Sequence, residues 1–401
     1  MISDDVFSIL PYGKKRELHR LSNLKNGFVV FKNHEVDLVK NKTKSREGKP
    51  RINFLLDSIL NKKSTHILCH AFYEMGYFQF EDLYSFIPED KPLFIFLEFK
   101  EFVPYVFENQ DENKQRRNNF SYVRSESPSL EEYTSAFKKG REELFKGNCY
   151  QFNLTFPFRY KTKKIGKEDL VFKYINHPKR RGEFSSFTFI KGFEKAIWSN
   201  SPESLFQLRE KKDSFWIQSR PIKGTNFIKD FGNFDEAWRD LSLSKKNQAE
   251  LFMITDMLRN DLNRIEKPCV KVPHKKVPLS APGLVHQMSL VEIEISKNNK
   301  FSKIFNSIFP GGSITGAPKK RVMAILKGLE IEHRGIYCGS TILSSGNKVD
   351  CSINIRTSDF DLGTGLMTYG AGGGVTVLSD LTGEFQEMQN KVLSFESLLD
   401  S

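Results

Sequence analysis

The chain has 401 residues, of which 61 are Lys or Arg and 49 are Asp or Glu, so its formal net charge is +12. This length allows two or three cores or one large composite domain, and no apolar stretch is long enough for a transmembrane helix, which excludes that class of membrane protein. The basic residues are scattered and do not form one stripe with interleaved aromatic residues, so we expect no nucleic-acid partner.

The number and spacing of the cysteines argue against two kinds of stabilising cross-link. Their number is odd and no two have CxxC spacing, which argues against a disulfide framework and a structural zinc site. The amino terminus has two early aspartates and no apolar core segment, so we expect no signal peptide and a cytoplasmic protein. The five residues are Cys69, Cys149, Cys269, Cys338 and Cys351.

The first 120 residues alternate short apolar runs with basic loops. Runs such as 28–31, 67–69 and 93–97 predict strands with a few helices. The polar segment 108–119 predicts a linker or an exposed loop. No chemical motif appears in this part of the chain.

Four later segments have helical signals. Residues 129–146 have apolar side chains every three or four positions before Gly147, a candidate C-cap. Residues 245–265 carry one apolar stripe with Glu250 near its edge, and helices are also expected over 319–330 and 382–399. The last two follow glycine-rich runs that match neither a Walker loop nor a dinucleotide fingerprint but allow close backbone approach to a small ligand.

A predicted hairpin brings an acid and an amine together. Residues 205–208 and 215–218 are short strand-like runs joined by a polar turn, and Glu203 and Lys223 are equidistant from that turn. Because a free lysine has a pKa of about 10.4, a nucleophilic lysine needs burial or a nearby cation. The pair therefore indicates either an acid with a nucleophile or a simple salt bridge that closes the hairpin.

A second hairpin is predicted over 336–343 and 349–357, with Tyr337 opposite Arg356. Alternation places Cys351, Ile353 and Ile355 on a core face, and Ser352, Asn354 and Arg356 on a polar face.

The last predicted helix places two carboxylates on one face. Glu384, Glu387 and Lys391 stand at i, i+3 and i+7. Mg²⁺ typically takes one or two carboxylates and completes its shell with water and substrate oxygens, and Glu250 could add a third. A solvated face, or pairing of the glutamates with Lys391, is the other interpretation.

Nine motifs occur in an order that resembles the chorismate-binding enzymes, which include component I of anthranilate synthase and of aminodeoxychorismate synthase and the isochorismate and salicylate synthases. The similarity covers about residues 128–397. The motifs are SPES (201–204), RPIKGT (220–225), AELFMITDMLRND (249–261), VHQMS (285–289), PGGSITGAPK (310–319), RGIYCG (334–339), INIRT (353–357), GAGGG (370–374) and EFQEMQNK (384–391).

The resemblance implies an α+β fold in which two large antiparallel sheets pack nearly orthogonally with helices outside. Residues 1–120 would form a divergent amino-terminal region of this composite fold, in which a tryptophan site cannot be inferred, and residues 121–401 the chorismate-binding catalytic domain.

Lys223 stands where anthranilate synthases have Ala, so within the family the chain resembles the aminodeoxychorismate synthases of the 4-aminobenzoate and folate branch. The resemblance implies an amination of the transaminase class. Lys223 would attack C2 of chorismate while Glu203 protonates the departing C4 hydroxyl, and ammonia would then add at C4 and expel the lysine. Component I of anthranilate synthase is the second possibility.

The resemblance also assigns further roles. Glu250, Glu384 and Glu387 would bind Mg²⁺. A separate glutamine amidotransferase subunit would supply ammonia, since no amidotransferase motif is found. Substrate-binding roles fall to Tyr337, Arg356, Gly372, His286, Gln151 and Thr315.

Two of these assignments need a comment. His286 would lie near the ring carboxylate, although a hydrogen-bonded core histidine is the other interpretation. Gln151 takes the place of the lysine that activates water in isochorismate-forming relatives, which argues against water as the nucleophile.

Overall fold

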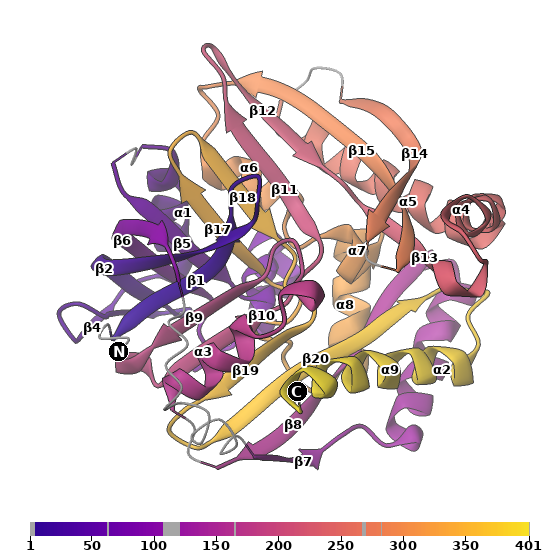
Figure 1. Ribbon diagram of the computed structural model, residues 1–401, viewed down its shortest axis with the longest axis horizontal. Helices are drawn as coiled ribbons and strands as arrows, with labels where there is room; N and C mark the ends of the chain where they lie inside the picture. Colours follow the sequence, from indigo (N-terminus) through magenta and orange to yellow (C-terminus); the bar gives the residue numbers. More distant parts are fainter. Residues whose placement is uncertain are drawn as a thin grey trace.

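The computed structural model describes residues 5–61, 64–106, 121–163, 166–266, 270–281 and 283–400 (Figure 1). The predicted linker at 108–119 and Cys269 lie outside these residues. The strands are β1 (Val6–Tyr12), β2 (Glu17–Val30), β3 (His34–Asp37), β4 (Lys42–Ser45), β5 (His66–Ala71), β6 (Phe94–Pro104), β7 (Tyr122–Glu126), β8 (Gln151–Thr162), β9 (Ser186–Ile190), β10 (Lys195–Ser199), β11 (Ser204–Glu210), β12 (Ser214–Ser219), β13 (Ile222–Phe227), β14 (Lys271–Ala281), β15 (Leu284–Ser296), β16 (Gly316–Ala317), β17 (Ser340–Ser345), β18 (Lys348–Ser352), β19 (Thr357–Asp361) and β20 (Leu366–Val375).

The helices include those expected from the sequence. Ser129 caps α2 through a capping box, and Gly147 follows this helix with φ of 71°. The α-helices are α1 (Gly48–Ser58), α2 (Leu130–Phe145), α3 (Lys167–Ile175), α4 (Phe234–Leu243), α5 (Lys245–Asn263), α6 (Phe301–Ile308), α7 (Gly312–Thr315), α8 (Lys319–Leu329) and α9 (Leu381–Leu399). The 3₁₀ turns include η2 (Tyr73–Gln79), η3 (Glu81–Phe86) and η8 (Ile228–Asp230).

Antiparallel ladders connect the strands into one network. From one end the order is β14, β15, β12, β11, β18, β17, β5, β6, β2, β1, β9, β10, β19, β20, β8 and β7, and β13 also pairs with β15. Strands of the first 106 residues therefore lie in the middle of this order. Strands of the later residues form both of its ends.

Helices cover the two ends of the strand order. Helices α4 and α5 pack on β13 and β15, whereas α2, α8 and α9 pack on β8 and β20. Figure 1 shows these two groups on the same side of the molecule, with α4 and α5 above α2 and α9. Two large buried clusters of apolar side chains fill the interior, and a third lies beneath the amino-terminal strands.

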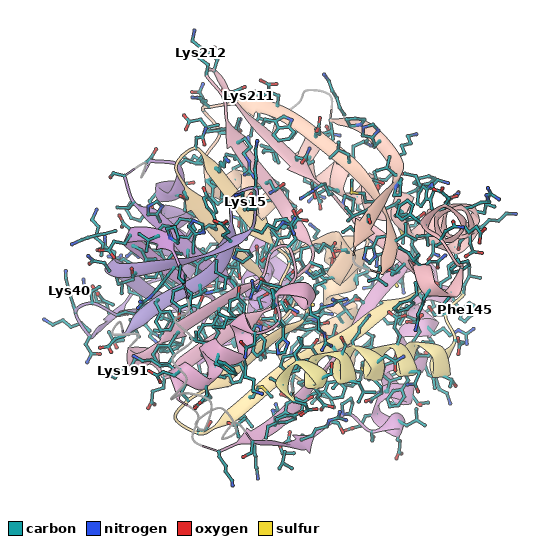
Figure 2. All side chains as sticks on the ribbon, viewed as in Figure 1. Lys15, Lys40, Phe145, Lys191, Lys211 and Lys212 are labelled. Atoms are coloured by element: carbon teal, nitrogen blue, oxygen red, sulfur yellow. The ribbon has the colours of Figure 1, made fainter. Side chains whose placement is uncertain are left out.

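Charged side chains extend from the surface, and the described cysteines lie in the interior. Figure 2 shows Lys40 and Lys191 at the left of the molecule, Lys211 and Lys212 together at its top, and Lys15 over the middle of the view. The four described cysteines are buried, and no disulfide joins them. Within the described residues, every helix is too short or too polar to cross a lipid bilayer.

Candidate functional site

The first hairpin forms as expected and carries Glu203 at its open end. Strands β11 and β12 pair with Gln207 opposite Gln218. Continued to the open end, this register sets position 203 opposite position 222, which is one residue from Lys223. After Pro221 the chain continues as β13, which pairs with β15. Lys223 therefore reaches Glu203 from the neighbouring strand and not across a ladder of the same hairpin.

The surroundings of Glu203 favour its protonated form. Burial raises the pKa of the Glu203 carboxyl, while the Lys223 ammonium and the Ser313 hydroxyl lower it and only partly offset the rise. The Glu203 carbonyl is held by the Ile353 amide at 3.0 Å. A carboxyl group with a raised pKa beside a lysine can act as a general acid.

His286 lies on β15 next to this pair. Its Nδ1 is 2.8 Å from the Thr225 hydroxyl on β13, so the ring takes part in a hydrogen bond between the two strands. Burial lowers the pKa of His286, and the positive charge of Arg356 lowers it further. A neutral imidazole in this position can donate its one ring N–H to a bound anion.

The second hairpin forms, but its strands end before Tyr337 and Arg356. Ile342 pairs with Cys351, and β17 begins at Ser340 while β18 ends at Ser352, so the opposition of positions 337 and 356 stays a prediction. Arg356 is exposed and has φ of 52°, whereas the Tyr337 ring is buried against Gly370, where any Cβ would lie 2.2 Å from the ring. Only glycine fits at that position of β20.

The polar face of this hairpin is buried at Ser352 and Asn354. The Thr341 hydroxyl donates to the Asn354 side chain at 2.9 Å, and the Ser352 hydroxyl donates to the same side chain, so these polar groups are hydrogen-bonded to one another inside the molecule. Every residue of β17 is buried, so both faces of this strand lie inside the molecule, and β5 pairs with its other edge. Arg356 alone of the three polar positions is exposed.

Helix α9 turns its acidic face toward the glycine-rich end of β20. Lys391 donates to the Gly372 carbonyl at 2.7 Å and lies 2.8 Å from Glu387. Glu384 accepts a hydrogen bond of 2.7 Å from the Ser379 hydroxyl. A Cβ on Gly373 would come within 3.1 Å of a Glu384 oxygen, so these carboxylates lie directly against the strand backbone.

The pKa values of Glu384 and Glu387 are shifted in opposite directions. Burial and the negative charge of Glu387 raise the pKa of Glu384, which the Ser379 hydrogen bond only partly offsets. Burial by itself would raise the pKa of Glu387. The nearby ammonium groups of Lys391, Lys223 and Lys246 outweigh it, so the pKa of this carboxyl is lowered.

The donor set fits Mg²⁺ in part. Glu384 and Glu387 present hard oxygen atoms close together, as Mg²⁺ prefers. Glu250 lies on α5 and is partly buried. In the described part of the chain no three Asp, Glu, His or Cys side chains gather as metal ligands, so the structure does not bring Glu250 into one cluster with the α9 glutamates.

Gln151 and Thr315 are both buried. The side-chain oxygen of Gln151 has no hydrogen-bond partner among the described residues, and a Cβ on Gly374 would lie 2.3 Å from its amide nitrogen. Thr315 donates to the Gly311 carbonyl at 2.9 Å, so its hydroxyl is used within the glycine-rich loop. The substrate-binding roles of both residues stay predictions.

The comparisons with known proteins identify the family. Residues 37–397 match the model of the chorismate binding enzyme family. The chain belongs to this family. Aminodeoxychorismate synthase component 1 of Klebsiella aerogenes is 38% identical over 267 residues, which are 66% of this chain and 57% of that protein. The Escherichia coli protein of the same name is 36% identical over 265 residues, and the chain thus spans a little over half the length of these curated relatives.

Solved structures of the family share the fold. Anthranilate synthase component I of Streptococcus pneumoniae superposes with a TM-score of 0.72 at 20% identity, covering 98% of this chain and 93% of that one. A Bacillus anthracis protein described as a putative isochorismate synthase gives 0.70 at 15% identity, covering 99% and 96%. The expected α+β fold with large antiparallel sheets and outer helices is confirmed.

Three residues near the family motifs were missed. Ser313 lies in a motif but was not singled out, and it lowers the pKa of Glu203. Ser379 precedes α9 and Lys246 begins α5, and both act on the α9 glutamates. A hydroxyl residue before a helix is a visible signal, but nothing in the local sequence shows that Lys246 faces α9.

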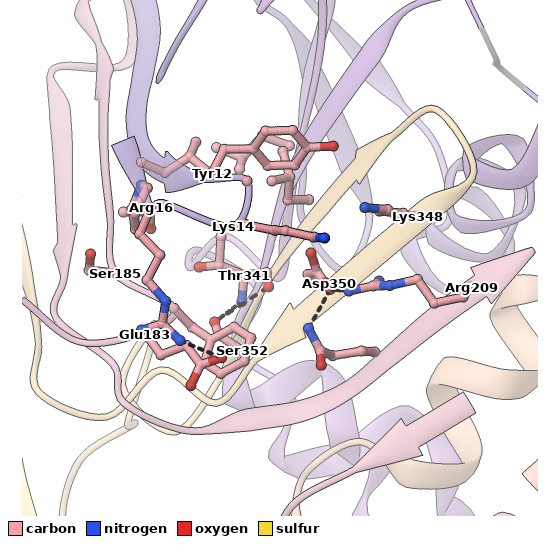
Figure 3. Close-up of a pocket in the computed structure, with 18 residues that line it drawn as sticks. Tyr12, Lys14, Arg16, Glu183, Ser185, Arg209, Thr341, Lys348, Asp350 and Ser352 are labelled. Atoms are coloured by element: carbon pink, nitrogen blue, oxygen red, sulfur yellow. Dashed lines mark hydrogen bonds and ion pairs between the residues drawn. The ribbon is translucent and has the colours of Figure 1, made fainter. Parts of the chain in front are cut away.

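One cavity is lined by residues of this set, and a second cavity lies apart from it. One of about 610 Å³ is lined by Tyr337, Gly370 and Thr155 and by the buried Glu330–Arg334 ion pair. The other, of about 280 Å³, is shown in Figure 3.

The pocket of Figure 3 lies between the β1–β2 turn and the β17–β18 hairpin. Two ion pairs lie within it, Arg16 with Glu183 at 2.8 Å and Arg209 with Asp350 at 2.6 Å, and Lys14 and Lys348 also line it. None of the residues that line it belongs to the set predicted for chemistry.

Proposed function

We propose that this chain is component I of an aminodeoxychorismate synthase, which converts chorismate and ammonia into 4-amino-4-deoxychorismate for the synthesis of 4-aminobenzoate and folate. The observation that carries the proposal is Lys223, which lies next to a Glu203 carboxyl whose pKa is raised by burial. An acid and an amine together are the pair that a double displacement needs. The names of the curated relatives support the same reaction.

In the proposed reaction each group has one task. The Lys223 amine forms a bond to C2 of chorismate while the ring double bond shifts and the C4–oxygen bond breaks. Glu203 gives its proton to the departing oxygen, which leaves as water. Ammonia then bonds to C4, the C2–nitrogen bond breaks, and the carboxylate of Glu203 accepts a proton from the new ammonium group.

Other residues bind and orient the substrate in this proposal. The exposed guanidinium of Arg356 pairs with a carboxylate in bidentate geometry, and His286, Tyr337 and the Gly372 backbone complete the binding surface. Gln151 is buried where an amide can hydrogen-bond but cannot remove a proton from water. This supports ammonia as the nucleophile.

Glu384 and Glu387 would hold Mg²⁺, and Glu250 is the proposed third ligand. When bound, Mg²⁺ would neutralise the ring carboxylate of chorismate and screen the negative charge of the pocket. Lys391 holds Glu387 beside the Gly372 backbone, so the protein positions one ligand before any metal binds.

The proposed partner is a glutamine amidotransferase subunit that supplies ammonia. The words "component 1" in the names of the relatives support a second component. The described cysteines are buried thiols outside any disulfide, which supports a reducing compartment such as the cytoplasm.

The test is product analysis of the purified chain with chorismate, Mg²⁺ and an ammonium salt, coupled to aminodeoxychorismate lyase. We expect 4-aminobenzoate. Anthranilate, salicylate or isochorismate would show another reaction of the same family. If chorismate stays unchanged, the assay is repeated with the amidotransferase subunit and glutamine, and unchanged chorismate there would reject the proposal.

A further inference from the structure

Strand β13 contains a β-bulge at the position of the proposed nucleophile. Ile222 pairs with Met288 of β15, and Thr225 pairs with His286 of the same strand. Three steps along β13 therefore match only two steps along β15, so β13 holds one extra residue between these pairs, at residues 223–224. Bulges are frequent beside active sites, where they redirect a side chain.

The extra residue changes which side chains share a face of the sheet. In a regular strand, side chains three positions apart point to opposite faces. Here Ile222 and Thr225 share a face, because their partners on β15 are two positions apart. The Thr225 hydroxyl accordingly lies 2.8 Å from Nδ1 of His286. This hydrogen bond joins the residue directly after the bulge to β15.

Gly224 provides the backbone conformation of the bulge. Its φ of 84° lies in the left-handed region, which glycine adopts without strain. A Cβ at this position would lie 2.9 Å from Cδ1 of Leu241 on α4 and 3.0 Å from Cγ of Asn247 on α5. The backbone of the bulge is thus packed against both helices, and the bond between Thr225 and His286 ties it to the sheet.

The Lys223 side chain, which starts at this bulge, acts on carboxylates of two other elements. Its ammonium group lowers the pKa of Glu203 at the end of the first hairpin and that of Glu387 on α9. A charge has such an effect only on groups close to it. The half-buried lysine is therefore directed into the candidate site.

We propose that the bulge in β13 aims the Lys223 side chain at Glu203, and that Thr225 is a positioning residue because its hydrogen bond to His286 holds the bulge in place. Thr225 acts through the backbone that it shares with the lysine, so the role requires no contact with the substrate. The link to amination rests on the proposed function, whereas the aim of the lysine does not depend on it.

The pKa of Glu203 reports the position of Lys223 without any turnover. Because the Lys223 ammonium lowers this pKa, a lysine that turns away should let the pKa rise. Thr225→Val removes the hydroxyl from an exposed side chain, so the variant is expected to fold. Carbon-13 NMR of labelled glutamate should show a higher pKa of Glu203 in Thr225→Val than in wild type, and the wild-type value in Thr225→Ser. The same pKa in all three proteins would reject the proposal.

Kinetic constants separate positioning from contact with the substrate. Loss of one hydrogen bond should lower kcat for the amination by about three- to tenfold in Thr225→Val, with KM for chorismate changed less than about twofold. Thr225→Ser should keep most of kcat. Thr364→Val, which alters an exposed threonine between β19 and β20, is the control and leaves both constants unchanged. A raised KM with unchanged kcat in Thr225→Val would make Thr225 a substrate contact and overturn the positioning role.

The two proposals fail separately. A wild-type chain that does not aminate chorismate, even with its amidotransferase subunit, would reject the proposed function. The NMR comparison of Thr225→Val with wild type would still decide whether Thr225 holds Lys223 beside Glu203.

Discussion

Glu203 and Lys223 illustrate how two opposed effects set the state of one carboxyl group. Burial favours the neutral acid, and the neighbouring ammonium favours the carboxylate. The pKa is raised because burial is the larger effect. The lysine therefore limits the rise and keeps the acid able to give up its proton.

Replacing Lys223 by Ala is the first prediction at this scale. The nucleophile is lost, so ammonia-dependent formation of aminodeoxychorismate is expected to fall at least about a hundredfold. Mass spectrometry of the protein with chorismate should show an adduct in the wild type and none in the variant. The control is Lys229→Ala, an exposed lysine at the end of the same strand. Equal rates in Lys223→Ala and wild type would remove the covalent role.

The pKa of Glu203 gives a second prediction. Because the Lys223 ammonium lowers this pKa, Lys223→Met should raise it further, and the protonated form should persist to higher pH. The pKa of the wild-type Glu203 carboxyl should itself lie above the ordinary range of a glutamate side chain. Carbon-13 NMR of labelled glutamate, with Glu203→Gln to assign the signal, measures both. A lower pKa in Lys223→Met would show that the two groups are not neighbours in solution.

At the scale of an element, helix α9 is built around an internal counter-ion. Glu384 and Glu387 are like charges at i, i+3, which is unfavourable on a free helix. Lys391 offsets this by pairing with Glu387 and by anchoring the helix to the Gly372 carbonyl. The cation that a metal would supply is thus partly replaced by an ammonium group.

Lys391→Met is therefore expected to increase affinity for Mg²⁺ in the absence of chorismate. Because the Lys391–Glu387 ion pair is partly exposed, its loss should change the affinity for Mg²⁺ by only about two- to fivefold. Isothermal titration calorimetry with MgCl₂ measures it. Lys139→Met on the exposed face of α2 alters the net charge equally and should leave the affinity unchanged. Weaker binding in Lys391→Met would mean that this lysine supports the metal.

Glu74 gives the 3₁₀ turn η2 a pH-dependent anchor. Its carboxylate accepts the Arg334 amide at 2.7 Å and the Gly335 amide at 3.3 Å, and thereby ties η2 to the loop after α8. Burial raises the pKa of Glu74 to about 7, although these backbone hydrogen bonds oppose the rise. The folded state therefore keeps this proton to higher pH than the unfolded chain does.

The sign of the stability change follows from that difference. The contribution of Glu74 to stability is fully present below pH 4.5 and is lost as pH rises through about 7, with a change of about 3 kcal/mol. Urea unfolding from pH 4.5 to 8 should show a steeper decline for wild type than for Glu74→Gln, whose amide oxygen can still accept both backbone hydrogen bonds. Exposed Glu81→Gln is the control. Parallel curves for wild type and Glu74→Gln would contradict the buried carboxyl.

At the scale of the whole molecule, local sequence patterns predicted the hairpins but did not predict the order of the strands in the sheets. The β11–β12 and β17–β18 hairpins follow from alternation and turns, because their partners are close in sequence. The pairing of β17 with β5 joins residues about 270 positions apart, and no period or turn residue signals such a contact. The burial of the polar face of the second hairpin does not follow from its own sequence for this reason.

The candidate site was predictable to a similar extent. Glu203, Lys223 and the α9 glutamates stand in recognisable motifs, so the sequence selects them. Their neighbours come from other elements: Ser379 reaches Glu384, and Lys246 acts on the same glutamates from α5. The burial that raises the pKa of Glu203 comes from packing among several elements, which sequence patterns do not describe.

The strand order predicts that residues 121–401 do not fold alone. Strands β1, β2, β5 and β6 connect β9 to β17, so removing residues 1–106 leaves two long strands with unpaired edges. The fragment 121–401 is expected to aggregate, whereas coexpression with fragment 1–106 should yield a complex. Size-exclusion chromatography and a thermal melt followed by circular dichroism measure both. Cooperative unfolding of monomeric 121–401 would show that the later strands form an independent domain, and the two ends of the strand order would then meet without the amino-terminal strands between them.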